Sequence, residues 1–103
     1  MAKSILQSDM TTCYICGKFI TGKPDPHHIY NGGGLRDKSD EDGLVVYVHR
    51  TCHTWLHNHP KSNWNIKARV QKIWQEYYGK NEEDFIKRYG KNYIGEINEK
   101  NTD

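Results

Sequence analysis

Apolar residues recur in the second half of the chain at positions i, i+4, i+7, i+8 and i+11. These positions are Ile66, Val70, Ile73, Trp74 and Tyr77. The spacing places all five residues on one face of an α-helix, and polar residues occupy the other face. Gly79 follows, and glycine is common at the C-terminal end of a helix. The pattern therefore predicts an amphipathic helix that ends near Gly79.

A second, shorter helix is expected immediately afterwards. Asn81 suits the N-cap position, because its side chain can accept a hydrogen bond from a free backbone N–H group. Residues 82–84 are all acidic, and negative charge is favourable in the first turn of a helix. Phe85 and Tyr89 supply an apolar side at helical spacing, and Gly90 marks the expected end.

The first half of the chain has a different character. Residues 13–60 contain every cysteine, every histidine and all three prolines. This composition is typical of loops, short strands and metal sites rather than of long helices. Three consecutive glycines at 32–34 predict a loop. The apolar, β-branched run Leu44–Val48 predicts a strand.

Length and composition favour one small domain that needs an additional staple. The chain has 103 residues, of which 35% are hydrophobic, and small domains with thin cores commonly rely on a disulfide or a metal. Three cysteines fit paired disulfides poorly, and we recognise no signal or membrane segment. We therefore expect a cytoplasmic protein with reduced, metal-binding cysteines. Residues 1–12 and 98–103 are expected to be flexible ends.

Two short motifs have the spacing of zinc ligands. Cys13 and Cys16 form a CxxC motif followed by Gly17, and His49 and Cys52 form an HxxC motif. Together they provide the four ligands of a closed, tetrahedral structural zinc site. One alternative is that the cysteines are unligated thiols. Another is a redox-active CxxC, but the βαβ context of a thioredoxin-like protein is absent.

Four further histidines lie near these motifs. His53 and His57 are four residues apart, so on a helix both imidazoles lie on one face and can bind the same ion. His27 and His28 are adjacent on chain that we expect to be extended, so their side chains point to opposite sides. One can then face a metal ion while the other faces a substrate. A plainer alternative is that these histidines extend zinc binding or simply pack. His59 has no matching partner, and we interpret it as a surface residue.

Taken together, the motifs resemble those of the HNH, or ββα-metal, endonucleases. The shared features are the His-His pair in segment 26–29, a glycine-bearing loop, an apolar strand, and segment 49–57 with its HxxC and HxxxH spacings. The CxxC motif resembles the zinc-containing branch of the family. The whole chain is also similar to small phage-encoded HNH proteins, including the ending at residues 85–93.

The resemblance implies a fold and a set of roles. The expected fold class is α+β, with one domain over residues 13–97. A ββα-metal (His-Me finger) core with its Cys3His zinc knuckle would occupy residues 13–60, and two C-terminal helices would occupy residues 61–97. His27, His53 and His57 would bind a catalytic divalent ion, and His28 would be the general base. Because imidazole ligands suit transition metals better than magnesium, manganese, nickel or cobalt should serve at least as well as magnesium, with zinc a further candidate.

One element departs from the family pattern. The family places an asparagine just before its second strand, where it braces the loop that carries the base. Segment 39–43 contains no asparagine. Asp40 or Asp42 could accept the same hydrogen bond, and Asn31 lies close to the base in the sequence. These three alternatives remain open at this point.

The implied activity is metal-dependent hydrolysis of DNA phosphodiester bonds, by nicking or cutting. Arg36, Lys38 and Arg50 flank the expected site, and Lys61 lies just beyond it. All four are candidate contacts to DNA phosphates, which would make binding salt-sensitive and weakly sequence-specific. The net charge is only +2, so an ordinary solvated surface is an equal alternative for such residues. By family analogy the protein would act in phage DNA metabolism in the bacterial cytoplasm, as a monomer or a homodimer.

A function of a different class is also compatible with the sequence. The chain could be a non-catalytic zinc module that binds nucleic acid or a host protein on an HNH scaffold. The missing asparagine and the modest positive charge favour this alternative. The presence of His28 favours the enzyme, because a binding module has no need of a base at that position.

Overall fold

A short β-hairpin with a helix between its strands forms the centre of the molecule. The computed structural model describes residues 4–94, and within them the chain forms one two-stranded antiparallel sheet and four helices. In chain order these are β1 (Asp25–His28), α1 (Leu35–Asp42), β2 (Val45–Val48), α2 (Arg50–His57), α3 (Pro60–Tyr78) and α4 (Glu82–Tyr89). The α+β class that the sequence predicted is confirmed.

The hairpin sets the register of the histidine pair. Asp25 lies opposite Val48, and His28 lies opposite Val45. The predicted strand at 44–48 is confirmed as β2, and the glycine run at 32–34 lies in the loop before α1. Since successive residues of a strand face opposite sides, His27 is buried at 2% exposure, whereas the His28 side chain retains 14%.

Helix α1 was not predicted from the sequence. Its residues are mostly charged, and Ser39 is its only buried member. The Ser39 hydroxyl donates to the carbonyl of Tyr30 and accepts from the Tyr30 N–H group, at 2.7 and 3.1 Å. Gly34 and Gly43 flank the helix in the left-handed conformation, with φ of 87° and 77°. Side-chain hydrogen bonds and glycine caps hold α1 in place, and its sequence has no apolar periodicity. The sequence therefore contains no helical pattern from which α1 could be predicted.

The two C-terminal helices agree with the sequence prediction. Helix α3 begins at Pro60 and is followed by Gly79 as its left-handed C-cap, with φ of 64°. Helix α4 begins after Asn81, whose side chain accepts from the N–H group of Asp84, and the Asp84 carboxylate accepts from the N–H group of Asn81. This reciprocal capping box satisfies two backbone donors at the start of α4.

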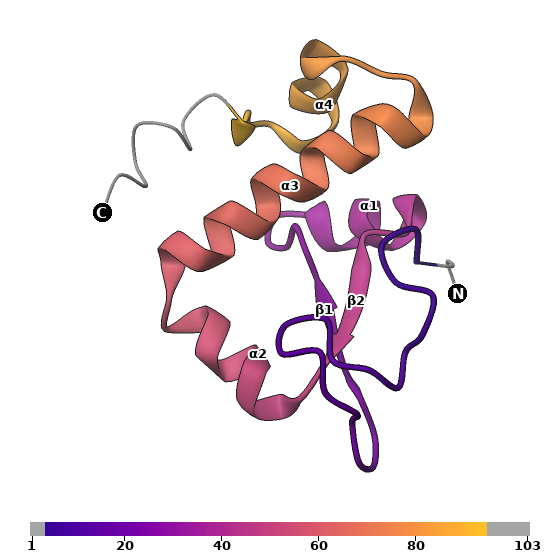
Figure 1. Cartoon of the computed structure of the whole chain (residues 1–103). Coiled ribbons are helices and arrows are strands. Elements are labelled where there is room, and N and C mark those ends of the chain that lie inside the picture. Colours follow the sequence, from indigo (N-terminus) through magenta and orange to yellow (C-terminus); the bar gives the residue numbers. More distant parts are fainter. Residues whose placement is uncertain (1–3, 95–103) are drawn as a thin grey trace.

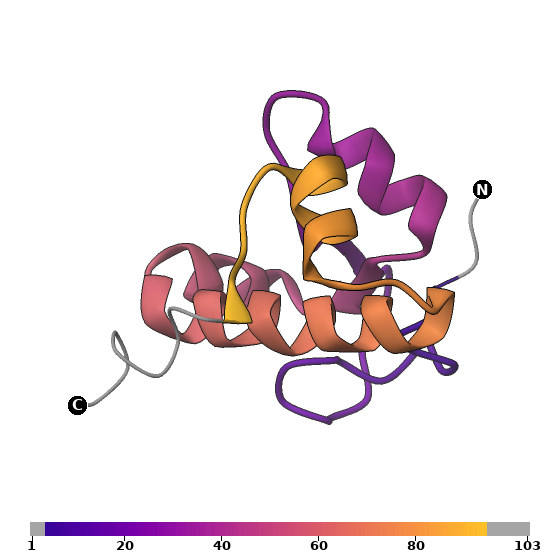
Figure 2. The same cartoon turned by 90° about the horizontal axis from the view of Figure 1, so that it is seen from above.

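Helices α3 and α4 lie beyond the end of the hairpin that is joined to α1 (Figure 1), and α4 lies beside both α1 and α3 when the molecule is seen from above (Figure 2). An aromatic cluster joins these layers. The ring of Tyr30, which follows β1, lies 5.3 Å from Phe85, 4.8 Å from Tyr89 and 5.4 Å from Tyr93, measured between centroids. Tyr30 and Phe85 are fully buried, so the loop that follows the histidine pair is fixed to the core.

The end of α1 is held by a three-donor hydrogen-bond network. Asp42 Oδ2 accepts from Trp74 Nε1 at 2.8 Å, from Arg88 Nε at 2.7 Å and from the Tyr89 hydroxyl at 2.6 Å. The donors belong to α3 and α4, so this one carboxylate connects three helices. Hydrogen bonds to a charged group contribute about 1.5–3 kcal/mol each. We therefore regard Asp42 as a structural residue.

Part of the segment expected to be a flexible N-terminus lies against β2. The Gln7 side chain accepts from the N–H group of Tyr47 at 2.7 Å, and its amide nitrogen lies 3.4 Å from the Tyr47 carbonyl. The N–H group of Ile5 donates to the carbonyl of Gly43 at 2.9 Å. The first three residues and the expected tail at 98–103 lie outside the described residues. Among residues 4–94, no helix has the length and apolar character needed to cross a membrane.

Candidate functional site

The first candidate site is the Cys3His cluster predicted from the CxxC and HxxC motifs. The ligand atoms of Cys13, Cys16, His49 and Cys52 all lie within 4.8 Å of one another. His49 Nδ1 is 3.4 Å from the sulfur of Cys16 and 3.9 Å from the sulfur of Cys52. Donor atoms of a tetrahedral zinc site are roughly 3.3–3.8 Å apart. The cluster could therefore hold a structural metal ion such as zinc.

Local hydrogen bonds shape the knuckle that presents these ligands. The N–H group of Gly17 donates to the carbonyl of Cys13 at 2.9 Å, and the N–H group of Cys13 donates to the carbonyl of Lys18 at 2.8 Å. His49 Nε2 lies 3.1 Å from the carbonyl of Phe19. A carbonyl can only accept, so Nε2 carries the proton and Nδ1 is left as the ligand atom. This contact could not be predicted from the sequence, because every residue has a backbone carbonyl and residue type does not reveal which one is the acceptor.

The thiols of the cluster differ in acidity. Burial opposes ionisation of Cys13, but N–H groups of Cys16, His49 and Ile15 outweigh it and lower the pKa of Cys13 to about 6. Burial, followed by the neighbouring Cys13 and Cys16, raises the pKa of Cys52 to about 12. Three thiolates in one cluster would repel one another, and a bound divalent cation would relieve that repulsion.

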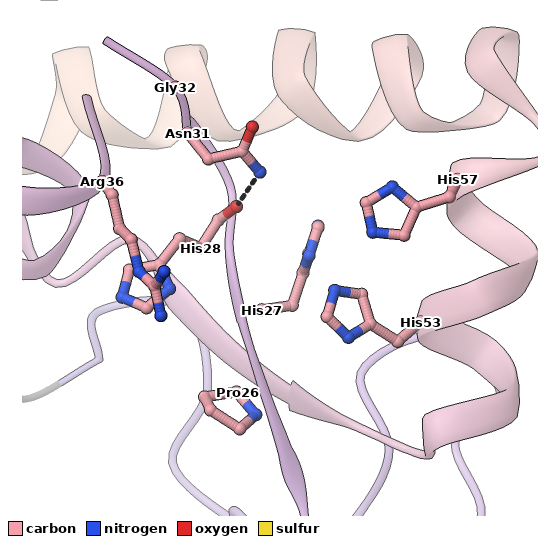
Figure 3. A pocket seen from close by; sticks show the side chains of 8 residues that line it. All are labelled: Pro26, His27, His28, Asn31, Gly32, Arg36, His53 and His57. Atoms are coloured by element: carbon pink, nitrogen blue, oxygen red, sulfur yellow. Dashed lines mark hydrogen bonds between the residues drawn. The ribbon is translucent and has the colours of Figure 1, made fainter. Parts of the chain in front are cut away.

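The second candidate site is a cleft lined by four histidines. It has a volume of about 330 Å³ and lies between β1, the glycine loop, α1 and α2. The residues that line it are Pro26, His27, His28, Asn31, Gly32, Arg36, His53 and His57. Figure 3 shows His27, His53 and His57 gathered on one side of β1 and the His28 ring on the other side, next to Arg36. The predicted opposite orientation of His27 and His28 is therefore confirmed.

The rings of the three gathered histidines lie close together. The centroids of His27 and His53 are 4.9 Å apart, and those of His53 and His57 are 5.0 Å apart. His53 and His57 are one turn apart on α2, as their spacing predicted. An imidazole can donate or accept hydrogen bonds and can bind transition metals. All three rings line the same cleft.

His27 carries the clearest evidence of an unmet partner. Both of its ring nitrogens are buried and have no hydrogen-bond partner within the described part of the chain. Burial, and then the charge of His53, lower its pKa from 6.5 to about 4. The ring is therefore neutral near pH 7, with an accepting lone pair. Buried polar atoms are rarely left unpaired, so His27 calls for a partner that residues 4–94 do not supply.

Asp25 orients one of these histidines and was missed in the sequence. Its Oδ2 atom lies 3.0 Å from His53 Nδ1 and 2.9 Å from Arg50 Nε. Hydrogen bonding from His53 is the main cause that holds the pKa of Asp25 below its usual range; burial opposes it, and the charge of Arg50 adds a further lowering. Because Nδ1 donates to a carboxylate, Nε2 of His53 is left as the free acceptor. Asp25 lies two positions before His27 on β1, and residues two apart share a strand face. This spacing is the signal from which Asp25 could have been found in the sequence.

His28 contacts one of the three proposed substitutes for the missing asparagine through its ring. His28 Nε2 lies 3.3 Å from Asp40 Oδ1. Asn31 instead donates to the backbone carbonyl of His28, at 3.4 Å, and Asp42 belongs to the helix network. A further hollow of about 270 Å³ shares Pro26, His28 and Arg36 with the cleft, so His28 borders both spaces.

The four candidate DNA contacts occupy different surroundings. Arg36 lines the cleft, and Arg50, with its side chain 82% exposed, pairs with Asp25. Lys61 lies in the first turn of α3. Lys38 lies two positions after Arg36 on α1, and its ammonium group donates to the carbonyl of Arg88 in α4 at 2.9 Å. Lys38 is thus on the other side of α1 from the histidine cleft.

The low pKa of His27 predicts an acid-dependent loss of stability. The unfolded chain takes up a proton near pH 6.5, whereas folded His27 does so only near pH 4. Stability is therefore retained above pH 6.5 and is lost as the pH falls towards 4. Between pH 7 and 5.5, the wild type should lose about 1 kcal/mol more than His27→Asn in urea unfolding. Any loss of zinc at low pH should affect the wild type and His27→Asn equally, so it cancels in the comparison. Equal losses in the two proteins would contradict the buried, neutral state of His27.

Comparisons of the chain with models of protein families, with curated proteins and with solved structures gave no match.

Proposed function

We propose that the protein is a metal-dependent DNA endonuclease of the HNH type, stabilised by a separate structural zinc ion. The observation that carries the proposal is the buried, neutral His27 ring, unpaired at both nitrogens. It faces His53 and His57 in a cleft that also contains His28. The zinc cluster supports the same assignment, because the two motifs occur together in the resembled family.

The proposed roles in phosphodiester hydrolysis are assigned to residues on the two sides of β1. His27, His53 and His57 would hold a divalent ion, which when bound supplies positive charge to the scissile phosphate and to the leaving oxygen. Asp25 fixes the His53 ring for this task. His28 takes the proton from the attacking water, and Asp40 holds the His28 ring. Arg36, which borders both hollows, contacts a substrate phosphate.

A supercoiled-plasmid assay with the purified, zinc-containing protein tests this proposal. We expect conversion to open-circle or linear DNA with manganese, nickel or cobalt at least as fast as with magnesium, and inhibition by brief chelation. His57→Ala should reduce cleavage at least 100-fold. His59→Ala is the matched control, because His59 binds the carbonyl of Trp55 and does not line the cleft.

The outcomes separate the two function classes. Cleavage that His57→Ala leaves intact would contradict the assigned ligands, and so would cleavage supported by magnesium alone. A protein that binds DNA but leaves plasmid, branched and single-stranded substrates uncut with every ion would favour the non-catalytic zinc module.

A further inference from the structure

A second, basic pocket lies on the far side of α1 from the histidine cleft. It has a volume of about 420 Å³ and is formed by α1, the end of α3 and α4. Its lining residues are Lys38, Trp74, Lys80, Asp84, Lys87 and Arg88. Four of these six are basic and one is acidic. Because the net charge of the whole chain is only +2, this is a marked local concentration of positive charge.

The charge that the pocket offers to a ligand comes from its lysines. Arg88 is neutralised by Glu41 and Asp42, at 2.9 and 2.7 Å. Lys80 and Lys87 are exposed, and within residues 4–94 no carboxylate pairs with either ammonium group. Lys38 donates to the Arg88 carbonyl, which is neutral, so its positive charge is also uncompensated.

The acidic member of the pocket has a role of its own. The Asp84 carboxylate accepts the N–H group of Asn81 as half of the capping box at the start of α4. Its presence is therefore explained by helix capping and does not call for a cationic ligand. The remaining groups are suited to an anion, and the ring of Trp74 lines the pocket beside them.

Helix α1 connects this pocket to the cleft. Arg36 and Asp40 line the hollow next to His28, whereas Lys38 lines the basic pocket. Residues two positions apart on a helix point to nearly opposite sides. An α-helix with its side chains is about 10 Å wide, which corresponds to about three nucleotides along one strand of duplex DNA. One duplex can therefore reach both sides of α1.

We propose that the pocket of Lys38, Lys80 and Lys87 binds backbone phosphates of the DNA that enters the histidine cleft. The inference rests on the proposed nuclease function for the identity of the polyanion. It assigns to α4 and to the turn after α3 the task of anchoring the duplex a few nucleotides from the cleaved bond. Such contacts hold the DNA without reading its sequence.

Binding of a fluorescent 20-base-pair duplex, measured by anisotropy over a range of salt concentrations without added divalent ion, tests the pocket directly. The double variant Lys80→Gln/Lys87→Gln removes two charges from exposed side chains. We expect roughly 10- to 100-fold weaker binding near 0.1 M salt, and a slope of log affinity against log salt that is smaller by about two. The charge-matched control is Lys23→Gln/Lys72→Gln, at two exposed lysines that line neither pocket.

The results distinguish failure of the pocket from failure of the nuclease assignment. The proposed phosphate binding by the pocket is overturned if the pocket variant keeps the wild-type slope, or if the control weakens binding equally. This holds even if the wild type cuts DNA. Selective loss of binding in a protein that never cuts supports the pocket and overturns the nuclease. A wild type that does not bind DNA overturns both.

Discussion

Replacement of Cys13 by serine will abolish binding of the structural zinc ion and will destabilise the protein by more than about 3 kcal/mol. Cys13 is 1% exposed, and its cluster joins the N-terminal knuckle to the start of α2, which also carries His53 and His57. Binding energy of a structural zinc ion is available only to the folded chain, so its loss appears as lost stability. Zinc content and thermal unfolding of the purified variant measure both effects.

The same experiment has an internal control in another histidine. His59→Ala should retain one equivalent of zinc and unfold close to the wild-type temperature, because His59 lies outside the cluster. His49→Ala should behave like Cys13→Ser. A Cys13→Ser protein that keeps its zinc, or that loses zinc without a change in unfolding temperature, would contradict a stabilising Cys3His site.

The elements that could be predicted are those with a strong local signal. Helix α3 combines a helical apolar pattern with a terminal glycine, and α4 combines an asparagine cap with an acidic first turn. Strand β2 has three valines, all buried in the core, and one partly buried tyrosine. The Cys3His cluster could be predicted for a similar reason, because two pairs at fixed spacing are visible without knowledge of the fold.

Contacts between distant residues could not be predicted in the same way. Helix α1 is held by Ser39 against Tyr30 and by Asp42 against α3 and α4, and nothing in its own residues shows an apolar face. Once α1 is known, helical geometry explains why Asp40 and Asp42 have different contacts. The two are two positions apart, so Asp40 faces His28 while Asp42 faces the opposite side.

The same geometry accounts for Lys38. From the sequence it appeared beside Arg36 as a contact near the cleft, but a helix places the two residues on opposite sides. Its ammonium group meets α4 instead. The orientation of His53 by Asp25 also depends on contact between β1 and α2, which brings together residues 28 positions apart in the sequence.

If the proposed nuclease function holds, replacement of His28 by alanine should reduce DNA cleavage by about 10²- to 10⁴-fold, the usual contribution of a general base. The fold and the zinc content should be unchanged. The side chain is 14% exposed, and its Nε2 atom lies 3.3 Å from Asp40 Oδ1. The measurement is the initial rate of plasmid nicking at saturating protein, together with zinc content and thermal unfolding. A variant that nicks as fast as the wild type would show that the activity comes from another residue or from a contaminant.

A double-mutant cycle then tests whether Asp40 acts through His28. Asp40→Ala should slow nicking about tenfold at saturating protein, and Asp40→Asn should recover most of the rate because its amide oxygen can still accept from the ring. In the His28→Ala background, Asp40→Ala should have no further effect, since a positioning residue has nothing left to position. Asp42→Ala should behave differently: it leaves Trp74, Arg88 and Tyr89 without their shared acceptor, so it lowers the unfolding temperature more than the rate of the folded protein. An additive effect of Asp40→Ala would place the role of this carboxylate outside the His28 ring.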